Sequence, residues 1–326
     1  MKTTFKRIWQ CILAQVLIAT LLSIQVHASE KLIVYITPGL DLPFWRTLGS
    51  GVKSIAEANA FRYEVMDSTN NDDKQIANVK AAIAKGAAGI VISPTDSKSA
   101  VAVLSLANQA KVPVVIADIG TNGGDFVSYV KADNYKGAYG VGAALAAAMK
   151  EKGWVNEPFA LCTISLSRKN GQDRTNGFRD AMKEAGFTNE VALKQMQTYT
   201  MEETYGFVNE ILKKNPKLRG LFIEVDKPTL GALNALKDQH KTGEVMVGSF
   251  DGIPEFVDHL KSGSIVAVGM QQPYLIGSKA AEALFSRLAG QTPPKQIIVP
   301  ILIATNKNIL ELLPTANKTV FGNESK

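Results

Sequence analysis

The sequence is poor in the residues on which disulfides, metal sites and thiol chemistry depend. It contains two cysteines and three histidines among 326 residues. Cys11 lies in the N-terminal apolar stretch, so Cys162 has no partner in the rest of the chain, and an internal disulfide there is excluded. Apolar neighbours in PFALCTISL favour a Cys162 that packs as a small hydrophobe, because a reactive thiol needs a nearby histidine or positive charge.

Motifs of common catalytic and nucleotide sites are also missing. His240 and His259 have no histidine or cysteine at zinc-site spacing. There is no Gly-x-Ser-x-Gly elbow, no P-loop, and no Gly-x-Gly-x-x-Gly after the first strand pattern. Gly137, Gly140 and Gly142 fall within a helix pattern, where close packing explains them better than phosphate binding does. We therefore expect no metal and no cofactor.

Positive charge is in slight excess and is not clustered. The formal charge of +6 becomes +3 (6 − 3) when Lys2, Lys6 and Arg7 of the N-terminus are set aside. A weak excess without a Lys/Arg cluster argues against nucleic acid as a partner.

Residues 1–28 are typical of a secretory signal peptide. Basic residues precede the apolar run 12–24, and Val26-His27-Ala28 supplies small residues before the expected cleavage point. The run is shorter than the roughly 20 apolar residues that span a bilayer. The stretch Ala138–Met149, flanked by lysines, predicts a buried helix of a soluble protein. We expect cleavage and release of the mature protein into the periplasm.

The remaining 298 residues (326 − 28) alternate between strand and helix patterns. This length exceeds what one core usually holds, which favours two domains. The alternation is typical of βαβ units and parallel sheets, and it predicts an α/β fold with two similar doubly wound lobes. Strands are expected at 32–36, 63–66, 89–92, 113–117, 126–130, 159–164, 191–195, 221–224, 245–250 and 265–269. Helices are expected at 44–59, 74–85, 97–110, 173–185, 202–213, 227–239, 254–261 and 273–288.

The two halves have no flexible linker of Gly, Ser or Pro between them. We therefore expect short crossing segments near Ala132–Asp133 and near Met270–Gln271. A turn over 290–294 then precedes the apolar segment 297–303.

In open parallel sheets, the loops that leave the carboxyl ends of strands line the ligand crevice. The rule selects 37–45, 67–71, 93–96, 118–122, 165–172, 225–227 and 251–252. Phe44 and Trp45 lie at the mouth of this crevice, and their rings, with that of Tyr199, can cover the C–H face of a sugar-like ring. The alternative is that Phe44 and Trp45 seal a helix onto the sheet.

Charged residues in these loops admit several interpretations. Asp118 and Asp251 each follow a strand pattern, and a pair of acids is the machinery of glycoside hydrolysis. The same aspartates could cap helices or turns, or accept hydrogen bonds from ligand hydroxyls. Arg174 is either an exposed charge or a fork of donors directed at the crevice.

Six segments, in order along the chain, resemble the periplasmic ribose-binding and related sugar-binding proteins of ABC transporters. They are MDSTNNDDKQIANVKA, ISPTDSKSAVAVLSLANQAKVPVVIAD, KADNYKG, NGFRDAM, LGALNAL and VGSFDGIPE. The resemblance implies a type I periplasmic binding protein fold, in which two lobes joined by three crossing segments close like a hinge on one ligand. It implies lobes of 29–132 plus about 272–303, and of 133–271 plus the C-terminal tail. It also implies a monomer that catalyses no reaction and that serves an ABC permease.

The resemblance also implies a set of ligand-binding residues, each of the chemical type that the family carries. They are Phe44, Trp45, Asp118, Arg174, Tyr199, Asp251 and Gln271.

Three positions depart from the ribose-binding pattern. Leu42 and Val225 stand where ribose binders carry Asn, and Ile119 stands where they carry Arg. Each lost hydrogen bond is worth roughly 0.5 to 1.5 kcal/mol net, so ribose would leave hydroxyls unpaired. We expect a ligand with fewer hydroxyls or a larger apolar face, such as a deoxysugar, a sugar-derived signal or a small polar non-sugar. Asp226 could partly compensate.

Alternative functions remain open at this point. A sensory adaptor for a membrane histidine kinase or chemoreceptor would use the same crevice. An exported hydrolase would use Asp118 and Asp251. Repressors share the implied fold, but this N-terminus carries a secretion pattern where a helix-turn-helix would be needed.

Overall fold

The computed structural model describes residues 31–322. The expected signal peptide, 1–28, and Cys11 within it lie outside the described residues. Between residues 31 and 322, no helix has the length and apolar character that crossing a membrane requires.

The first lobe is built on a six-stranded sheet in which every neighbouring pair of strands is parallel. The strand order is β11-β5-β4-β3-β1-β2. The strands are β1 (Leu32–Thr37), β2 (Arg62–Asp67), β3 (Ala87–Ile92), β4 (Val114–Ala117), β5 (Ser128–Ala132) and β11 (Gln296–Val299).

The second lobe repeats this plan with the order β12-β10-β9-β8-β6-β7. It is parallel except for β12, which pairs antiparallel with β10. The strands are β6 (Phe159–Thr163), β7 (Glu190–Gln195), β8 (Gly220–Ile223), β9 (Met246–Phe250), β10 (Ala267–Met270) and β12 (Leu302–Thr305).

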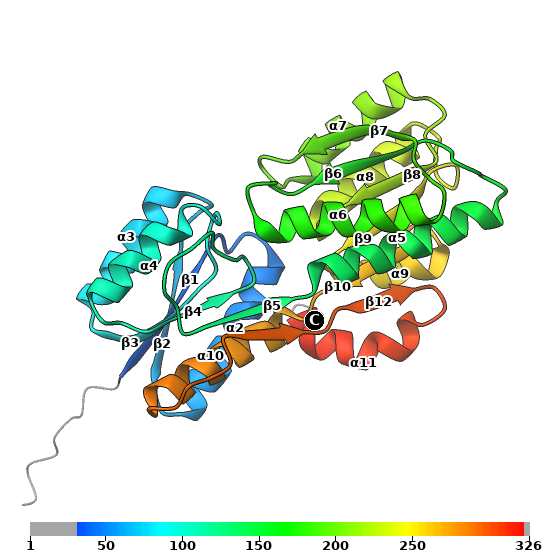
Figure 1. Cartoon of the computed structure of the whole chain (residues 1–326). Coiled ribbons are helices and arrows are strands. Elements are labelled where there is room, and N and C mark those ends of the chain that lie inside the picture. Colours follow the sequence, from blue (N-terminus) through cyan, green and yellow to red (C-terminus); the bar gives the residue numbers. More distant parts are fainter. Residues whose placement is uncertain (1–30, 323–326) are drawn as a thin grey trace, which may run out of the picture. The chain divides into compact units, whose positions relative to one another are not determined.

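Helices cover both faces of each sheet (Figure 1). In the first lobe, α2 (Pro43–Ala58) and α10 (Pro273–Leu288) pack on the face to which Ile33 and Tyr35 point. The opposite face, with Val34 and Ile36, packs on α3 (Asp72–Ala84) and α4 (Ala100–Gln109). Side chains of a strand alternate between faces, so an apolar strand such as β1 is buried on both.

The second lobe is layered in the same way. Its helices are α5 (Asn134–Glu151) and α6 (Lys169–Glu184) on one face, α7 (Met201–Lys214) and α8 (Asp226–Asp238) on the other, and α9 (Phe256–Ser262) and α11 (Ile309–Thr319) beside β10 and β12. Cys162 lies fully buried on β6 against the α7 and α8 layer. Burial raises the pKa of its thiol to about 12, which confirms the expected packing role.

The chain passes between the two sheets three times. It leaves the first sheet after β5 to begin α5, returns after β10 to begin α10, and crosses again between β11 and β12. The apolar segment 297–303 is therefore divided between two sheets, and Pro300 lies at the division.

The expected alternation of strands and helices is confirmed, and the differences are at element ends and in one unexpected helix. α5 begins at Asn134, four residues before its expected start, and α4 begins at Ala100, three residues after. α6 begins at Lys169, four residues before the expected start. The expected start was too late because Asn170 and Gly171 are poor helix formers, and their helical state depends on packing. A Cβ built on Gly171 would lie only 2.5 Å from the Ser165 carbonyl oxygen. α11 was not expected, since Pro314 within it argues against a helix.

Glycines in α5 serve close packing, as the sequence indicated. A Cβ built on Gly137 would lie 2.6 Å from Cδ1 of Ile301. One built on Gly142 would lie 2.9 Å from the carbonyl oxygen of Phe178 on the neighbouring helix α6. These contacts explain the glycines without a phosphate ligand.

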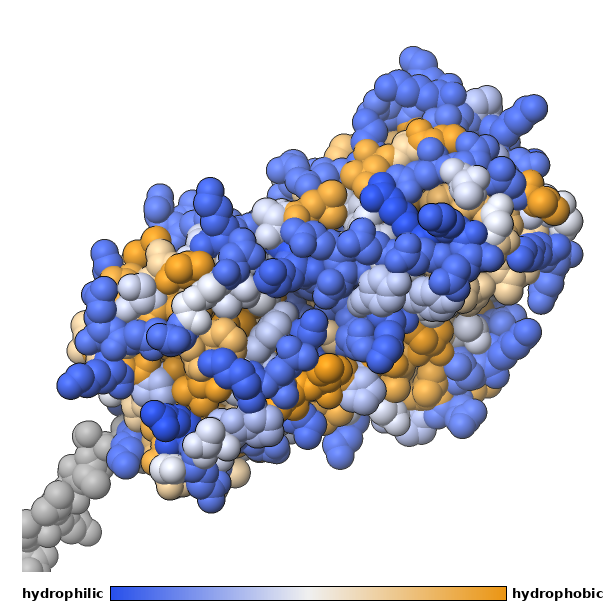
Figure 2. Space-filling model, in the orientation of Figure 1, coloured by the Kyte–Doolittle hydropathy of each residue, from blue (hydrophilic) through white to orange (hydrophobic). Residues whose placement is uncertain are grey.

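On the face shown in Figure 2, hydrophobic residues are scattered in small groups among hydrophilic ones. The most exposed large hydrophobic residue is Val155, which is 78% exposed. Singly exposed apolar residues are normal on protein surfaces, so this face does not by itself point to a partner.

Candidate ligand-binding site

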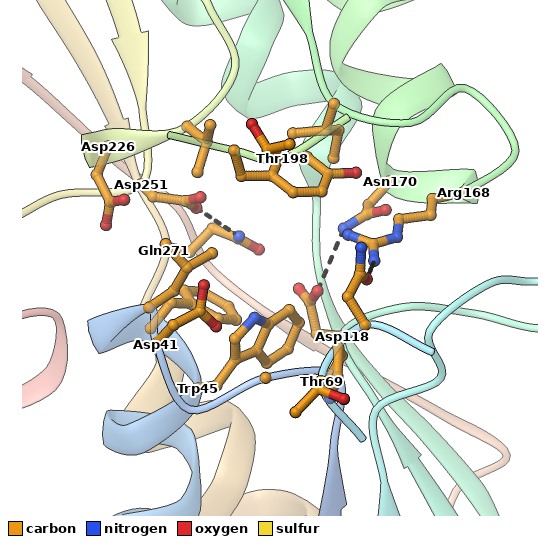
Figure 3. Close-up of a pocket in the computed structure, with 18 of the residues that line it drawn as sticks. Asp41, Trp45, Thr69, Asp118, Arg168, Asn170, Thr198, Asp226, Asp251 and Gln271 are labelled. Atoms are coloured by element: carbon orange, nitrogen blue, oxygen red, sulfur yellow. Dashed lines mark hydrogen bonds between the residues drawn. The ribbon is translucent and has the colours of Figure 1, made fainter. Parts of the chain in front are cut away.

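A cavity of about 420 Å³ lies where loops at the carboxyl ends of strands from both sheets meet. Figure 3 shows its side chains converging from both lobes. Ten of the candidate residues line it, namely Leu42, Phe44, Trp45, Asp118, Arg174, Tyr199, Val225, Asp226, Asp251 and Gln271. A cavity of this size holds a small molecule.

Ile119 is the exception among the candidate residues. Its side chain is fully buried in the first lobe's core, together with Val115 and Ala117, and it does not line the cavity. Ile119, the residue next to Asp118, therefore has a packing role in this chain.

Phe44 and Trp45 form the aromatic surface that the first lobe presents. Pro43 at the first position of α2 fixes the start of this helix directly after the loop that follows β1. The two rings meet edge to face, with centroids 4.8 Å apart and planes at 86°. Both side chains also belong to the buried core under α2, so they pack the helix and line the cavity at once.

Tyr199 lies across the cavity on the second lobe. It precedes α7 and adopts a left-handed backbone conformation with φ of 56°. The Arg168 guanidinium lies 5.4 Å from the centre of its ring, and its hydroxyl accepts a hydrogen bond from the backbone N–H of Ser165 at 3.3 Å. These contacts fix the ring beside the cavity.

Arg174 is the centre of a buried polar network. Its Nε donates to Asn134 Oδ1 at 2.8 Å, and its Nη1 donates to the carbonyl oxygen of Glu224 at 2.6 Å. Nη1 and Nη2 contact the two carboxylate oxygens of Asp251 at 3.3 and 3.4 Å. The guanidinium also stacks 4.1 Å from the ring centre of Phe250. A fork held on all sides in this way cannot swing out to solvent.

Asp251 and Gln271 complete this network. Nε2 of Gln271 donates to Oδ1 of Asp251 at 2.7 Å. Oε1 of Gln271 is buried and has no hydrogen-bond partner. Because buried polar atoms are normally paired, this oxygen indicates a place where a ligand donor can bind.

Asp118 lies opposite, at the end of β4. Its Oδ2 accepts from Nδ2 of Asn170 at 3.2 Å, whereas its Oδ1 is buried without a partner. Burial raises the pKa of this carboxyl to about 7, although the charge of Arg174 opposes the rise.

Two further buried carboxyls also have raised pKa values. Burial, and then the negative charge of Asp251, raise the pKa of Asp226 to about 7. Burial raises the pKa of Glu224 to about 8. Glu224 lies behind the cavity, where it accepts from the hydroxyl of Thr175 at 2.7 Å and from the backbone N–H of Ile164 at 3.0 Å.

Backbone strain is concentrated at this site. Nine non-glycine residues in the described chain have positive φ, and five of them line the cavity. They are Thr69, Asn70, Asp118, Tyr199 and Asp251. Such conformations cost about 1 to 3 kcal/mol each and persist where the surroundings fix them, typically at binding sites.

Sequence reasoning missed three polar residues that join the lobes beside the cavity. Arg168 donates to the Thr95 carbonyl at 2.8 Å and to Oδ1 of Asn70 at 2.6 Å, while Asn170 contacts Asp118. The loops 67–71 and 165–172 were selected correctly, but no local pattern marked Asn70, Arg168 or Asn170 within them. Their partners are 52 to 98 residues away in sequence.

The side chains that line the cavity suit the binding of a small molecule. Within residues 31–322, no group of three or more His, Cys, Asp or Glu is placed to hold a metal ion. Aromatic faces on one side and hydrogen-bonding groups on the other match a molecule with both an apolar and a polar surface.

The fold and cavity together define a two-lobed ligand-binding protein. A model of the periplasmic binding protein domain family matches residues 33–292, and the chain belongs to this family. Members are binding proteins of transporters, so the chain is not an enzyme, and the hydrolase interpretation of Asp118 and Asp251 is wrong.

Curated relatives support the same assignment. The ribose import binding protein of Salmonella typhimurium is 31% identical over 282 residues, which cover 86% of this chain and 93% of the relative. The D-apiose import binding protein of Actinobacillus succinogenes is 30% identical over 251 residues, covering 76% and 78% of the two chains.

Solved structures show the same fold. A carbohydrate transporter solute-binding protein from Agrobacterium radiobacter, in complex with D-arabinose, has a TM-score of 0.82 at 22% identity and covers 90% of this chain and 99% of that one. A periplasmic solute-binding protein from Actinobacillus succinogenes with bound D-allose has a TM-score of 0.80 at 22% identity, covering 86% and 100%. The type I periplasmic binding protein fold, expected from the sequence, is thereby confirmed.

Proposed function

We propose that this protein binds a small carbohydrate-like ligand in the cavity between its lobes and delivers it to an ABC importer. The observation that carries the proposal is the pairing of Phe44 and Trp45 on one lobe with the Arg174–Asp251–Gln271 network on the other, around one cavity. Curated relatives described as import binding proteins for ribose and D-apiose support it.

The setting of this function is part of the proposal. The protein is exported by cleavage of residues 1–28 and acts in the periplasm as a monomer. Its lobes comprise 29–132 plus about 272–300, and 133–271 plus the chain from β12 onward, because β12 pairs with β10 of the second sheet and not with the first lobe as expected from the sequence. The ligand-bound form docks on the membrane permease, because hinge closure changes the surface that a permease meets. The relatives' descriptions favour import over the sensory alternative.

The ligand that we propose is not ribose. Leu42 and Val225 present apolar side chains to the cavity. The side chain of Ile119 is buried in the core and does not reach the cavity. At these positions the site offers no hydrogen bonds to a ribose hydroxyl, so each unpaired hydroxyl would cost affinity. A deoxysugar, a sugar-derived signal or a small polar molecule with a larger apolar face suits these side chains better.

Isothermal titration calorimetry with matched sugars tests this proposal. We expect one site per chain, and tighter binding of deoxysugars and alkyl-substituted polyols than of their fully hydroxylated counterparts. Micromolar binding of ribose would contradict the choice of ligand. If a compound is found, its uptake should fall in a strain that lacks the gene, whereas a sensory protein would leave uptake unchanged.

A further inference from the structure

Negative charge exceeds positive charge in the cavity. Among the described residues that line it, five are aspartates, two are arginines, and none is a lysine, histidine or glutamate. The charged side chains are Asp41, Asp67, Asp118, Asp226, Asp251, Arg168 and Arg174. The formal balance is −3 (2 − 5) when all are ionised.

Both arginines are directed to groups of the protein itself. Arg174 donates to Asn134, to the Glu224 carbonyl and to Asp251. Arg168 donates to Asn70 and to the Thr95 carbonyl. Their positive charges are therefore largely engaged by groups of the protein, and they attract an anionic ligand only weakly.

The three buried aspartates differ in how well they are paired. Asp251 has an ion pair with Arg174 and a hydrogen bond from Gln271. Asp118 has one hydrogen bond, from Asn170, and an unpartnered Oδ1. The Asp226 carboxylate accepts from the backbone N–H of Lys227 at 2.6 Å, and it makes no ion pair with a described residue.

Asp226 and Asp118 mark two ends of the cavity. In Figure 3, Asp226 lies beside Asp251 and Gln271 at one end, whereas Asp118 lies with Arg168 and Asn170 at the other. Trp45 lies between the two ends. A single molecule that lies on the indole ring can thus contact the unpartnered oxygens of both Gln271 and Asp118.

Buried carboxylates without cationic partners are costly to ionise, and the cost is removed either by a proton or by a bound cation. The charged groups facing Asp226 are Asp251, Lys227 and Arg174, and those facing Asp118 are Arg174, Asp251, Arg168 and Lys131. The net effect in the free protein is that both pKa values rise to about 7. A ligand cation would replace the proton at Asp226.

We propose, building on the proposed function, that the ligand is a hydroxylated amine, such as an amino-deoxy sugar. Its ammonium group pairs with Asp226, and its hydroxyls donate to Oδ1 of Asp118 and Oε1 of Gln271. The apolar face of its ring or chain lies on Trp45, where a nearby cation is further attracted by the indole. Sugar acids and phosphorylated sugars are excluded by the same charges.

The test compares matched ligands by calorimetry on the intact mature protein at pH 7.5 and 0.15 M salt. Each set contains a sugar, its 2-amino-2-deoxy analogue and the N-acetyl form, for example glucose, glucosamine and N-acetylglucosamine. We expect the amine to bind at least tenfold tighter than both neutral members of at least one set. In buffers of different ionisation enthalpy at pH 7, its binding should release protons.

Asp226→Asn should remove this preference, because it should lower affinity for the amine at least tenfold more than it lowers affinity for the neutral sugar. Asp238→Asn, at the other end of α8, removes the same charge outside the cavity and should change neither. Proton release by the unaltered protein supplies a second readout if the Asp226 variant does not fold.

Neutral sugars that bind as tightly as their amines, without proton release, would overturn this inference and leave the proposed function standing. Sugar acids that bind more tightly would also overturn it. If no carbohydrate-like compound of any charge binds, the proposed function itself fails.

Discussion

Asp118 and Asp251 occupy equivalent places in the two lobes and have different surroundings. Each follows the third strand in its sheet's order, β4 or β9, and each has a left-handed backbone, with φ of 65° and 62°. Asp251 is paired with Arg174 and Gln271, whereas Asp118 has Asn170 and an unpartnered oxygen. The repeated fold supplies the position, and residues distant in sequence supply the chemistry.

This difference divides the labour of binding between the lobes. The second lobe holds its main polar groups in one network, so little reorganisation is needed when a ligand arrives. The first lobe presents the rings of Phe44 and Trp45, together with a carboxylate that still lacks a donor. A ligand therefore supplies the donors that Asp118 in the first lobe and Gln271 in the second still lack.

The largest expected effect comes from removing the cation that is paired with Asp251. Arg174→Ala leaves Asp251 buried without its cation and should lower the free energy of unfolding by about 3 to 5 kcal/mol. Asp118→Asn removes a buried charge with an unpartnered oxygen and should be neutral or stabilising in the ligand-free protein. Urea unfolding followed by circular dichroism measures both. Equal losses from the two variants would contradict the contrast between the lobes.

A smaller effect is expected from removing the aromatic surface of the first lobe. Trp45→Ala should weaken ligand binding by roughly 1 to 3 kcal/mol, because it removes buried ring area. Trp154→Ala is the matched control, since this indole stacks with Arg219 and does not line the cavity. Calorimetry compares the two. If Trp45→Ala binds as tightly as the unaltered protein, the indole only packs α2.

The smallest expected effect is a pH dependence of the ligand-free protein. Folding raises the pKa of Asp118 and Asp226 to about 7 and that of Glu224 to about 8, in each case through burial. The folded protein then binds more protons than the unfolded chain between about pH 4 and 8, so stability falls as pH rises through this range.

Carboxyls with lowered pKa values do not oppose this trend above pH 5. The pKa of Glu210, for example, is lowered to about 2 by hydrogen bonds from Lys194 and Lys214, so its contribution is lost only in stronger acid. Urea midpoints should fall from pH 5 to pH 8.5. Asp118→Asn and Asp226→Asn should each flatten the profile, and a rise in stability over the interval would refute the account.

Much of the site could be predicted from the sequence, because the carboxyl ends of parallel strands must lie together. That rule placed Trp45, Asp118 and Asp251 around one crevice, and the structure places all three along one cavity. Ile119 was also proposed, but it packs in the core. Of these two neighbours after β4, Asp118 turns to the cavity and Ile119 to the core, and the sequence does not show which of them turns inward.

Pairing between residues that are distant in sequence could not be predicted. Arg174 lies 77 residues from Asp251, and Asn170 lies 52 residues from Asp118, so no local pattern connects them. Arg168 was missed because α6 begins earlier than its Asn-Gly residues indicate, which brings Arg168 to the helix start and toward the other lobe. The contacts of Asn170 with Asp118 and of Arg168 with Thr95 and Asn70 depend on the docking of two lobes, whereas Arg174 and Asp251 meet within the second lobe.

The central claim is that the two lobes bind one small carbohydrate-like molecule and leave it chemically unchanged. The calorimetric panel tests it most directly when the cell contents are afterwards analysed by mass spectrometry. We predict one binding site per chain for a hydroxylated compound, which is recovered intact. A panel in which no compound gives heat or raises the melting temperature, or in which the bound compound is converted to product, would contradict the account.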